Sequence, residues 1–179
     1  MVLSLVNQKG GVGKTTTAVS LTAAMHALGK RVLLCDFDPQ ANATSGLGVE
    51  KTDVTSSIYD VIINDVPAKD AVISTKYGDL IPSGAALAGA GIELVSLDRR
   101  EFRLKDALEP LKKDYDYIFI DCPPSLELLT LNALCAADQV IVPVQCEYYA
   151  LEGLSDLMGT LRAVKRTYQP DIGIFGLVL

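Results

Sequence analysis

The chain has 179 residues, of which 49% are apolar, 21% charged and 6% aromatic, a profile typical of one globular domain rather than of a disordered or fibrous chain. At this length a fold buries roughly 70% of the surface of its unfolded chain, so stability requires neither disulfides nor a structural metal. The formal net charge of −6 excludes a general attraction to polyanions, so any contact with nucleic acid requires a local basic patch.

Short runs of consecutive apolar residues alternate with longer segments of helical periodicity. Strands covered by helices on both faces carry such runs, so the pattern predicts a doubly wound α/β domain with a mostly parallel sheet. The expected strands are Val2–Val6, Arg31–Asp36, Asp79–Pro82, Tyr117–Asp121, Gln139–Val144 and Ile172–Leu179. The expected helices are Lys14–Leu28, Ser56–Ile63, Gly91–Ser96, Glu101–Lys112, Leu126–Ala136 and Leu151–Thr167.

Residues 1–179 are expected to form a single domain. Before the helix at Leu126–Ala136, Pro123 and Pro124 end a strand, and Ser125 is expected to cap the helix. The chain ends at Leu179 inside an expected buried strand, which favours a fragment truncated at its C-terminus. No apolar run is long enough to cross a bilayer, so an integral membrane protein is not expected.

The strongest motif lies between the first expected strand and the first expected helix. It consists of Lys9, Gly10, Gly11, Val12, Gly13, Lys14, Thr15 and Thr16. Glycines let successive N–H groups turn inward, and the loop feeds a helix N-terminus. We therefore interpret it as a phosphate-binding loop for ATP or ADP, with Lys14 on the β and γ phosphates, Thr15 as a Mg²⁺ ligand and Thr16 at the α phosphate. A glycine-rich turn without a ligand is the alternative.

The loop departs from the strict pattern G-x-x-x-x-G-K-[ST], because Gln8 stands where the first glycine would be. Lys9 follows it as a second cation. Lys9 is either a solvated loop charge or a cation directed at phosphate, and the intact motif that follows favours phosphate.

Two expected strands end in carboxylates. Asp36 and Asp38 close one strand, where the period of two places both side chains on one side and Pro39 keeps Asp38 extended. Asp121 ends another strand, at the edge where open α/β sheets bind ligands. We predict that Asp36 and Asp121 lie in the Mg²⁺ environment, Asp121 through water, and that Asp38 orients or activates the attacking water. Alternatively, these acids merely end strands.

The cysteines form no C-x-x-C pair and follow no secretory leader. They are therefore predicted to be reduced thiols of a cytosolic protein, without a metal. The residues are Cys35, Cys122, Cys135 and Cys146.

Four segments in this order resemble the motifs of one family. They are Lys9–Thr17, Asp36–Gly48, Asp121–Ser125 and Val142–Gly153. They look like those of the ParA/Soj chromosome- and plasmid-partitioning ATPases, a class of P-loop NTPases with a deviant Walker A loop. The resemblance covers nearly the whole chain.

The resemblance implies an ATP-dependent homodimer, in which Lys9 reaches across to the phosphates of the partner subunit. A cation delivered in this way stabilises transition-state charge as an arginine finger does. The segment around Asp36 and Asp38 resembles the first switch of the family and Asp121–Ser125 the second. Glu147 matches a position near the dimer interface.

The resemblance also implies partners and a location. The ATP-bound dimer would bind DNA non-specifically on the bacterial nucleoid in the cytoplasm, and a ParB-type centromere-binding protein would stimulate hydrolysis and release it. The family fold continues past the position of Leu179 with residues that contact adenine and DNA. Within this chain, Arg162, Lys165 and Arg166 recur on one expected helix, where they contact DNA phosphates or form a solvated face.

Three other functions remain open. A MinD-like membrane-surface ATPase in division-site placement shares the loop but reaches lipid through a C-terminal amphipathic helix, which this sequence does not show. A scaffold resembling nitrogenase iron protein requires cysteines that bridge a dimer, and those of this chain do not match that arrangement. A non-hydrolysing regulatory module would hold ATP without releasing phosphate.

Overall fold

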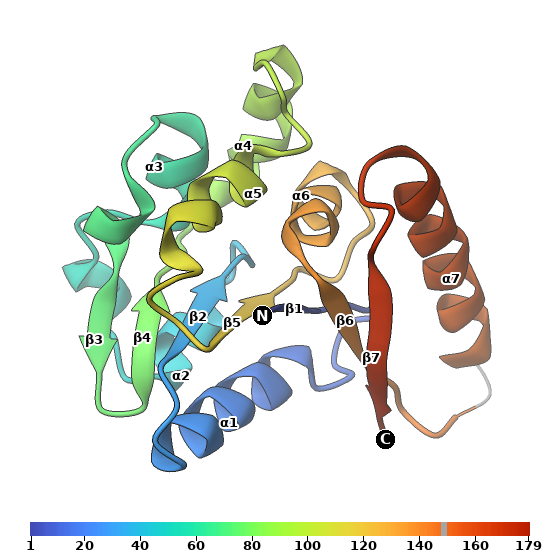
Figure 1. Cartoon of the computed structure of the whole chain (residues 1–179), viewed down its shortest axis with the longest axis horizontal. Helices are drawn as coiled ribbons and strands as arrows, with labels where there is room; N and C mark the ends of the chain where they lie inside the picture. Colours follow the sequence, from blue (N-terminus) through green and yellow to red (C-terminus); the bar gives the residue numbers. More distant parts are fainter. Residues whose placement is uncertain (148–149) are drawn as a thin grey trace.

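The computed structural model describes residues 1–147 and 150–179. Its centre is a seven-stranded sheet in the order β3-β4-β2-β5-β1-β6-β7 (Figure 1). Neighbouring strands are parallel, except that β3 runs antiparallel to β4. The strands are β1 (Val2–Leu5), β2 (Val32–Asp36), β3 (Ile73–Thr75), β4 (Gly78–Ile81), β5 (Tyr117–Asp121), β6 (Gln139–Pro143) and β7 (Gly173–Val178).

Helices connect most of the strands. They are α1 (Lys14–Ala27), α2 (Asn42–Gly46), α3 (Ile58–Ile63), α4 (Leu87–Glu93), α5 (Arg103–Leu108), α6 (Leu128–Ala136) and α7 (Ala150–Thr167). Short 3₁₀ turns lie at Lys51–Asp53, Ala68–Ala71, Leu94–Ser96 and Glu109–Leu111. Within the described ranges, none of the helices has both the length and the hydropathy needed to span a bilayer.

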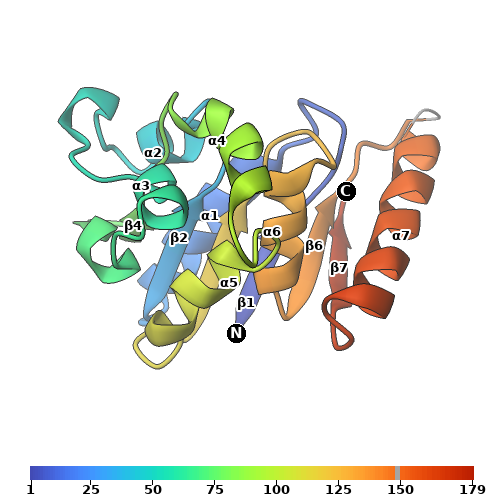
Figure 2. The ribbon, with the colours of Figure 1, turned by 90° about the horizontal axis from the view of Figure 1, so that it is seen from above.

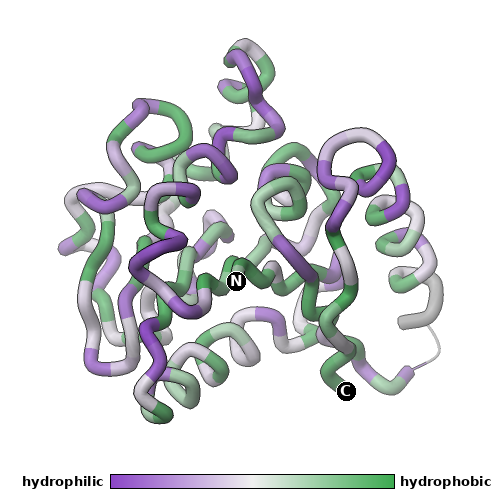
Figure 3. The backbone as a smooth tube through the Cα atoms, in the orientation of Figure 1, coloured by the Kyte–Doolittle hydropathy of each residue, from purple (hydrophilic) through white to green (hydrophobic). Residues whose placement is uncertain are grey.

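The helices form a layer on each face of the sheet. On one face, α1 and α2 pack against a cluster that includes Leu34 and Phe119. On the other face, α3 to α7 cover a larger cluster that includes Leu33 and Ile120 (Figure 2). Neighbouring residues such as Leu33 and Leu34 point to opposite faces and are both fully buried. This is why the strands read as unbroken apolar runs, visible as the hydrophobic centre in Figure 3.

The predicted fold class is confirmed, and each expected strand is present with ends that differ by at most one residue. β3 was not predicted; it is a short edge strand joined to β4 by a tight hairpin. Gly78 makes this turn possible because its φ of 125° lies outside the range that other residues adopt easily. The hydroxyl of Thr75 also donates to the carbonyl oxygen of Gly78 at 2.7 Å.

The observed helices differ from the expected ones in several details. α6 begins at Leu128, and Ser125 does not cap it: the carbonyl of Ser125 instead accepts a hydrogen bond from the Thr130 hydroxyl at 2.7 Å. The helix expected at Glu101–Lys112 is α-helical only to Leu108, because Pro110 lacks the N–H that a continued helix requires. α4 begins four residues before the expected Gly91, and α2 was not predicted.

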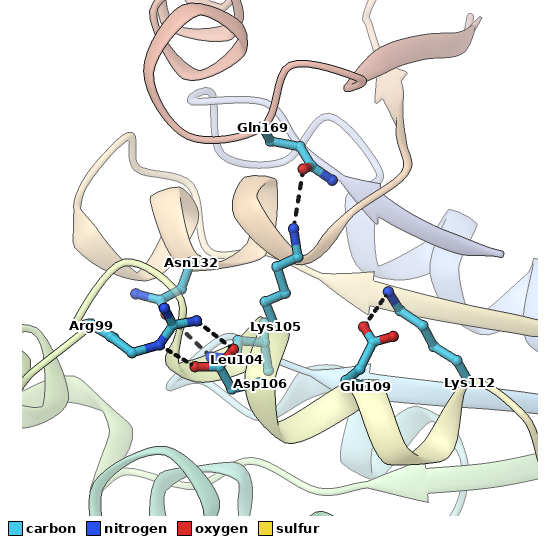
Figure 4. A network of polar contacts seen from close by, with 8 residues as sticks. All are labelled: Arg99, Leu104, Lys105, Asp106, Glu109, Lys112, Asn132 and Gln169. Atoms are coloured by element: carbon cyan, nitrogen blue, oxygen red, sulfur yellow. Dashed lines mark hydrogen bonds and ion pairs between the residues drawn. The ribbon is translucent and has the colours of Figure 1, made fainter.

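A buried asparagine joins α6 to α5 and the turn before it (Figure 4). The side chain of Asn132 is fully buried. Its Oδ1 accepts from the backbone N–H of Leu104 at 3.3 Å, and its Nδ2 donates to the carbonyl oxygens of Arg100 at 2.7 Å and Leu128 at 3.0 Å. The same region carries an exposed ion pair between Arg99 and Asp106, with an N–O distance of 2.8 Å.

Replacing Asn132 by alanine is expected to lower the free energy of unfolding by about 3 kcal/mol, because it leaves buried backbone groups without partners. Urea denaturation of the full-length protein measures this loss. Asp106→Ala is the control from the same network. Its partner Arg99 is largely exposed, so the loss should be below about 1 kcal/mol. Equal losses in the two variants would contradict the assignment.

Candidate functional site

The glycine-rich loop follows β1, which lies between β5 and β6 in the sheet. Gly11 and Gly13 have φ angles of 74° and 90°. A Cβ atom at either position would meet no other atom within 4 Å, so the left-handed backbone, and not a lack of space, requires glycine there. Gly13 directly precedes α1, and its carbonyl accepts from the N–H of Thr17 at 2.9 Å. The loop therefore leads directly into a helix N-terminus.

Lys14 is held inside this loop. Its side chain is 7% exposed, and its Nζ donates to the carbonyl oxygen of Lys9 at 3.0 Å. Burial lowers the pKa of Lys14, while the negative charges of Asp121 and Asp38 act in the opposite direction. The ammonium group thus lies close to the loop and to two acids. Thr15 beside it is half-buried.

Asp121 lies at the C-terminal end of β5, opposite Asp36 in the register of β2 and β5. It is fully buried, and neither carboxylate oxygen has a hydrogen-bond partner within the described structure. Burial raises the pKa of Asp121 to about 7, against the opposing effect of the nearby Thr15 hydroxyl, and the charges of Asp36 and Asp38 add to the rise. A buried carboxylate without partners is costly and indicates a missing ligand. Its two unused oxygens are suited to the water shell of Mg²⁺.

Asp36 differs from Asp121, although both were predicted to lie near Mg²⁺. Its Oδ2 accepts from the backbone N–H and from the hydroxyl of Thr44, both at 2.7 Å, and its Oδ1 accepts from the N–H of Asp38 at 3.2 Å. Burial raises the pKa of Asp36 to about 6, while the Thr44 hydrogen bonds act against this rise. Asp36 therefore lies beside the site with both oxygens already bound to the chain.

Asp38 follows Asp36 with the buried Phe37 between them and is 8% exposed. Its Oδ1 accepts from the backbone N–H of Gln40 at 2.9 Å, and its carbonyl accepts from the N–H of Ala41 at 2.9 Å. Ala41 has a φ of 51°, which is uncommon for a residue with a Cβ atom. A compact turn thus fixes the backbone that carries Asp38.

Lys9 lies at the edge of the site and forms an ion pair with Glu147 of the same chain. The two side chains are 39% and 43% exposed, so both can reach solvent or another molecule.

The connection after β6 also contacts the loop through Gln145, whose Nε2 donates to the carbonyl of Gly11 at 3.2 Å. The side chain of Asn7 links the loop to β6, since its Nδ2 donates to the carbonyl of Pro143 at 2.7 Å.

The structure brings the predicted loop, Asp36, Asp38 and Asp121 to one end of the sheet. Three residues of this region were not predicted as site residues: Thr44, which binds Asp36, and Asn7 and Gln145, which hold the loop. Thr44 and Gln145 fall within segments that carry the family resemblance, whereas Asn7 does not. The contacts of Asn7 and Gln145 depend on how distant segments meet. Within the described residues, no group of at least three His, Cys, Asp or Glu side chains could hold a metal. Mg²⁺ is commonly held by one or two protein groups together with substrate phosphates, so this arrangement suits it.

Two of the cysteines adjoin site residues, since Cys35 precedes Asp36 and Cys122 follows Asp121. None of the four cysteines forms a disulfide; three are buried and Cys146 is exposed.

A cavity of about 640 Å³ lies away from the glycine loop, between α5 and the segment that follows α3. None of its lining residues belongs to the predicted site.

The chain is similar to several known proteins. The family model described as an AAA domain matches residues 1–174. The sporulation initiation inhibitor protein Soj of Bacillus subtilis is 56% identical, over 99% of this chain and 71% of the relative. The chromosome partitioning protein ParA of Myxococcus xanthus is 53% identical, over 99% of this chain and 64% of the relative.

A solved structure with the same fold contains bound ligands. The cobyrinic acid a,c-diamide synthase from Mycobacterium smegmatis, with bound ADP and magnesium, superposes with a TM-score of 0.94 at 44% identity. The match covers 98% of this chain and 72% of that protein. Together, the family model, the sequence relatives and the fold show that this chain belongs to the ParA/Soj family of chromosome-partitioning ATPases.

Proposed function

We propose that residues 1–179 form the nucleotide domain of a DNA-partitioning switch that binds and hydrolyses ATP with Mg²⁺. The main observation that supports this proposal is the buried carboxylate of Asp121. It has no hydrogen-bond partner in the described structure and lies beside Lys14 and the glycine loop. A partitioning role is favoured over that of a cobyrinic acid synthase, because identity to Soj is 56% and to the synthase 44%.

Each site residue has a role in this proposal. Lys14 exchanges the carbonyl of Lys9 for the β and γ phosphates, and the loop N–H groups with Thr16 hold the remaining phosphate oxygens. The Thr15 hydroxyl and, through water, Asp121 hold Mg²⁺, which neutralises phosphate charge when bound. Asp38 orients the attacking water.

The proposal extends to assembly. Lys9 is directed at the phosphates of a second subunit, which requires it to leave Glu147 of its own chain. The exposure of both side chains supports this exchange, because a solvent-exposed ion pair is worth at most about 1 kcal/mol. The resulting homodimer binds DNA non-specifically, and a ParB-type protein stimulates hydrolysis and releases it.

The Lys9→Ala variant of the full-length protein tests this proposal. We expect it to bind ATP but to remain monomeric with ATP, because the cation that joins the two sites is missing. Light scattering with ATP and with ADP measures the mass, and fluorescence anisotropy at fixed salt measures DNA binding. The variant should therefore also lose ATP-dependent DNA binding.

Lys30→Ala is the matched control, since it removes an exposed lysine at the far end of α1. It should form dimers as the wild type does. If Lys9→Ala forms the same ATP-dependent dimer as Lys30→Ala, Lys9 does not act on the partner subunit.

A further inference from the structure

Thr44 has no role in the function proposed above, yet it occupies a central position. It is fully buried in α2, and both hydrogen-bonding capacities of its hydroxyl are used. The hydroxyl donates to Oδ2 of Asp36 at 2.7 Å and accepts from the backbone N–H of Ser83 at 3.0 Å. One side chain thus joins the end of β2, the helix α2 and the segment after β4.

These bonds close a loop of chain around Asp38. Asp36 lies two residues before Asp38, and its Oδ1 accepts from the Asp38 N–H at 3.2 Å. After Asp38 the chain turns at Gln40 and Ala41 and enters α2. Thr44, within α2, donates its backbone N–H to the same Asp36 carboxylate. The backbone of Asp38 is therefore fixed on both sides through a single carboxylate.

Two further features show that the chain around Asp38 is held in one conformation. Ala41 adopts a φ of 51°, a strained conformation that persists only where its surroundings enforce it. α2 also packs closely on α1: a Cβ atom built on Gly46 would lie 3.0 Å from Cγ2 of Val19. Because α2 is held against α1, the Thr44 hydroxyl sets the position of the first turn of α2 relative to β2.

We propose that Thr44 is a positioning residue, which holds Asp38 where its carboxylate can orient the attacking water. This inference rests on the proposed function, because it requires Asp38 to act in ATP hydrolysis. Removing the hydroxyl takes one donor from Asp36 and the acceptor from Ser83, and the turn at Ala41 can then relax. Thr44 contacts neither the glycine loop nor Lys14 in any described hydrogen bond, so nucleotide binding should not depend on it.

The experiment compares Thr44→Val and Thr44→Ser in the full-length protein. Valine keeps the shape and loses the hydroxyl, and we expect kcat to fall about 10- to 100-fold with KM unchanged, as for other groups that orient a site residue. Serine restores the hydroxyl and should restore most of kcat. Turnover is measured per mole of bound nucleotide, because a purely structural defect would lower the amount of competent protein and leave this ratio unchanged.

Thr22→Val is the matched control. Thr22 is also fully buried, and its hydroxyl donates to the carbonyl of Ala18 at 2.8 Å within α1, so this variant should keep the wild-type turnover per bound nucleotide. Wild-type kcat in Thr44→Val, or equal losses in Thr44→Val and Thr44→Ser, would overturn the inference.

Lys14→Ala separates this inference from the proposed function. If Lys14→Ala hydrolyses ATP as fast as the wild type, the proposed function fails. If Lys14→Ala loses turnover and Thr44→Val does not, only the role of Thr44 fails.

Discussion

Replacing Lys14 by alanine is expected to reduce ATP hydrolysis by at least about 10³-fold, the range seen when a positive group at a transferring phosphoryl is removed. Lys14 is 7% exposed and is the loop cation nearest to Asp121 and Asp38. Without it, these acids would repel the phosphates, and no buried cation of the loop would offset their charge. Phosphate release by the full-length protein and equilibrium nucleotide binding measure the effect.

Lys69→Ala controls for the loss of one lysine, since Lys69 is exposed and lines the cavity away from the site. It should hydrolyse ATP at the wild-type rate. The Lys14→Ala variant should remain folded, because burial already disfavours the charge it removes. Hydrolysis at wild-type rate in a folded Lys14→Ala protein would refute the assignment of the loop.

Replacing Asp121 by asparagine is expected to stabilise the nucleotide-free protein and to abolish the Mg²⁺ dependence of nucleotide binding. The folded-state pKa of Asp121 is raised from 3.8 to about 7, mainly by burial. The folded protein therefore holds a proton that the unfolded chain releases. Without Mg²⁺ and nucleotide, this group should make the wild-type free energy of unfolding fall between about pH 4 and pH 7, by a few kcal/mol.

Urea denaturation at several pH values measures this fall, which in the Asp121→Asn variant should be smaller and confined to below about pH 6. Asp36, with a pKa raised to about 6, contributes a fall of the same sign over the narrower range from about pH 4 to pH 6, and it is present in both proteins. Asp116→Asn is a control of opposite sign. Hydrogen bonds from Arg31 lower the pKa of Asp116 to about 2, so its contribution to stability is lost only below about pH 4. A fall between about pH 6 and pH 7 that survives unchanged in Asp121→Asn would contradict the role of Asp121.

The strands were predicted closely because a parallel sheet covered on both faces needs apolar residues at consecutive positions. β2 illustrates this, since each of its five residues is buried. β3 and α2 were not predicted, because what stabilises them lies outside their own residues. Each is short, and its residues gain their stability from partners elsewhere: β3 from β4 and α2 from Asp36 and α1. Local pattern carries little information about such elements.

Part of the candidate site could also be predicted from sequence. The loop from Lys9 to Thr16 and the acids at strand ends are recognisable because phosphate binding imposes residue types at fixed spacing along the chain. The sequence likewise places Asp36 and Asp121 at the same edge of the sheet, since parallel strands end together. These features depend on neighbours in sequence and on strand direction.

The tertiary structure alone decided which groups the side chains meet. Asp36 and Asp121 are both buried acids at strand ends. Thr44 and the backbone of Asp38 donate hydrogen bonds to both carboxylate oxygens of Asp36, whereas the carboxylate of Asp121 has no hydrogen-bond partner in the described structure. The pairing of Lys9 with Glu147 is another such contact. Hydrogen-bond partners come from segments distant in sequence, and their meeting is set by strand order and helix packing, which no local pattern of residues encodes.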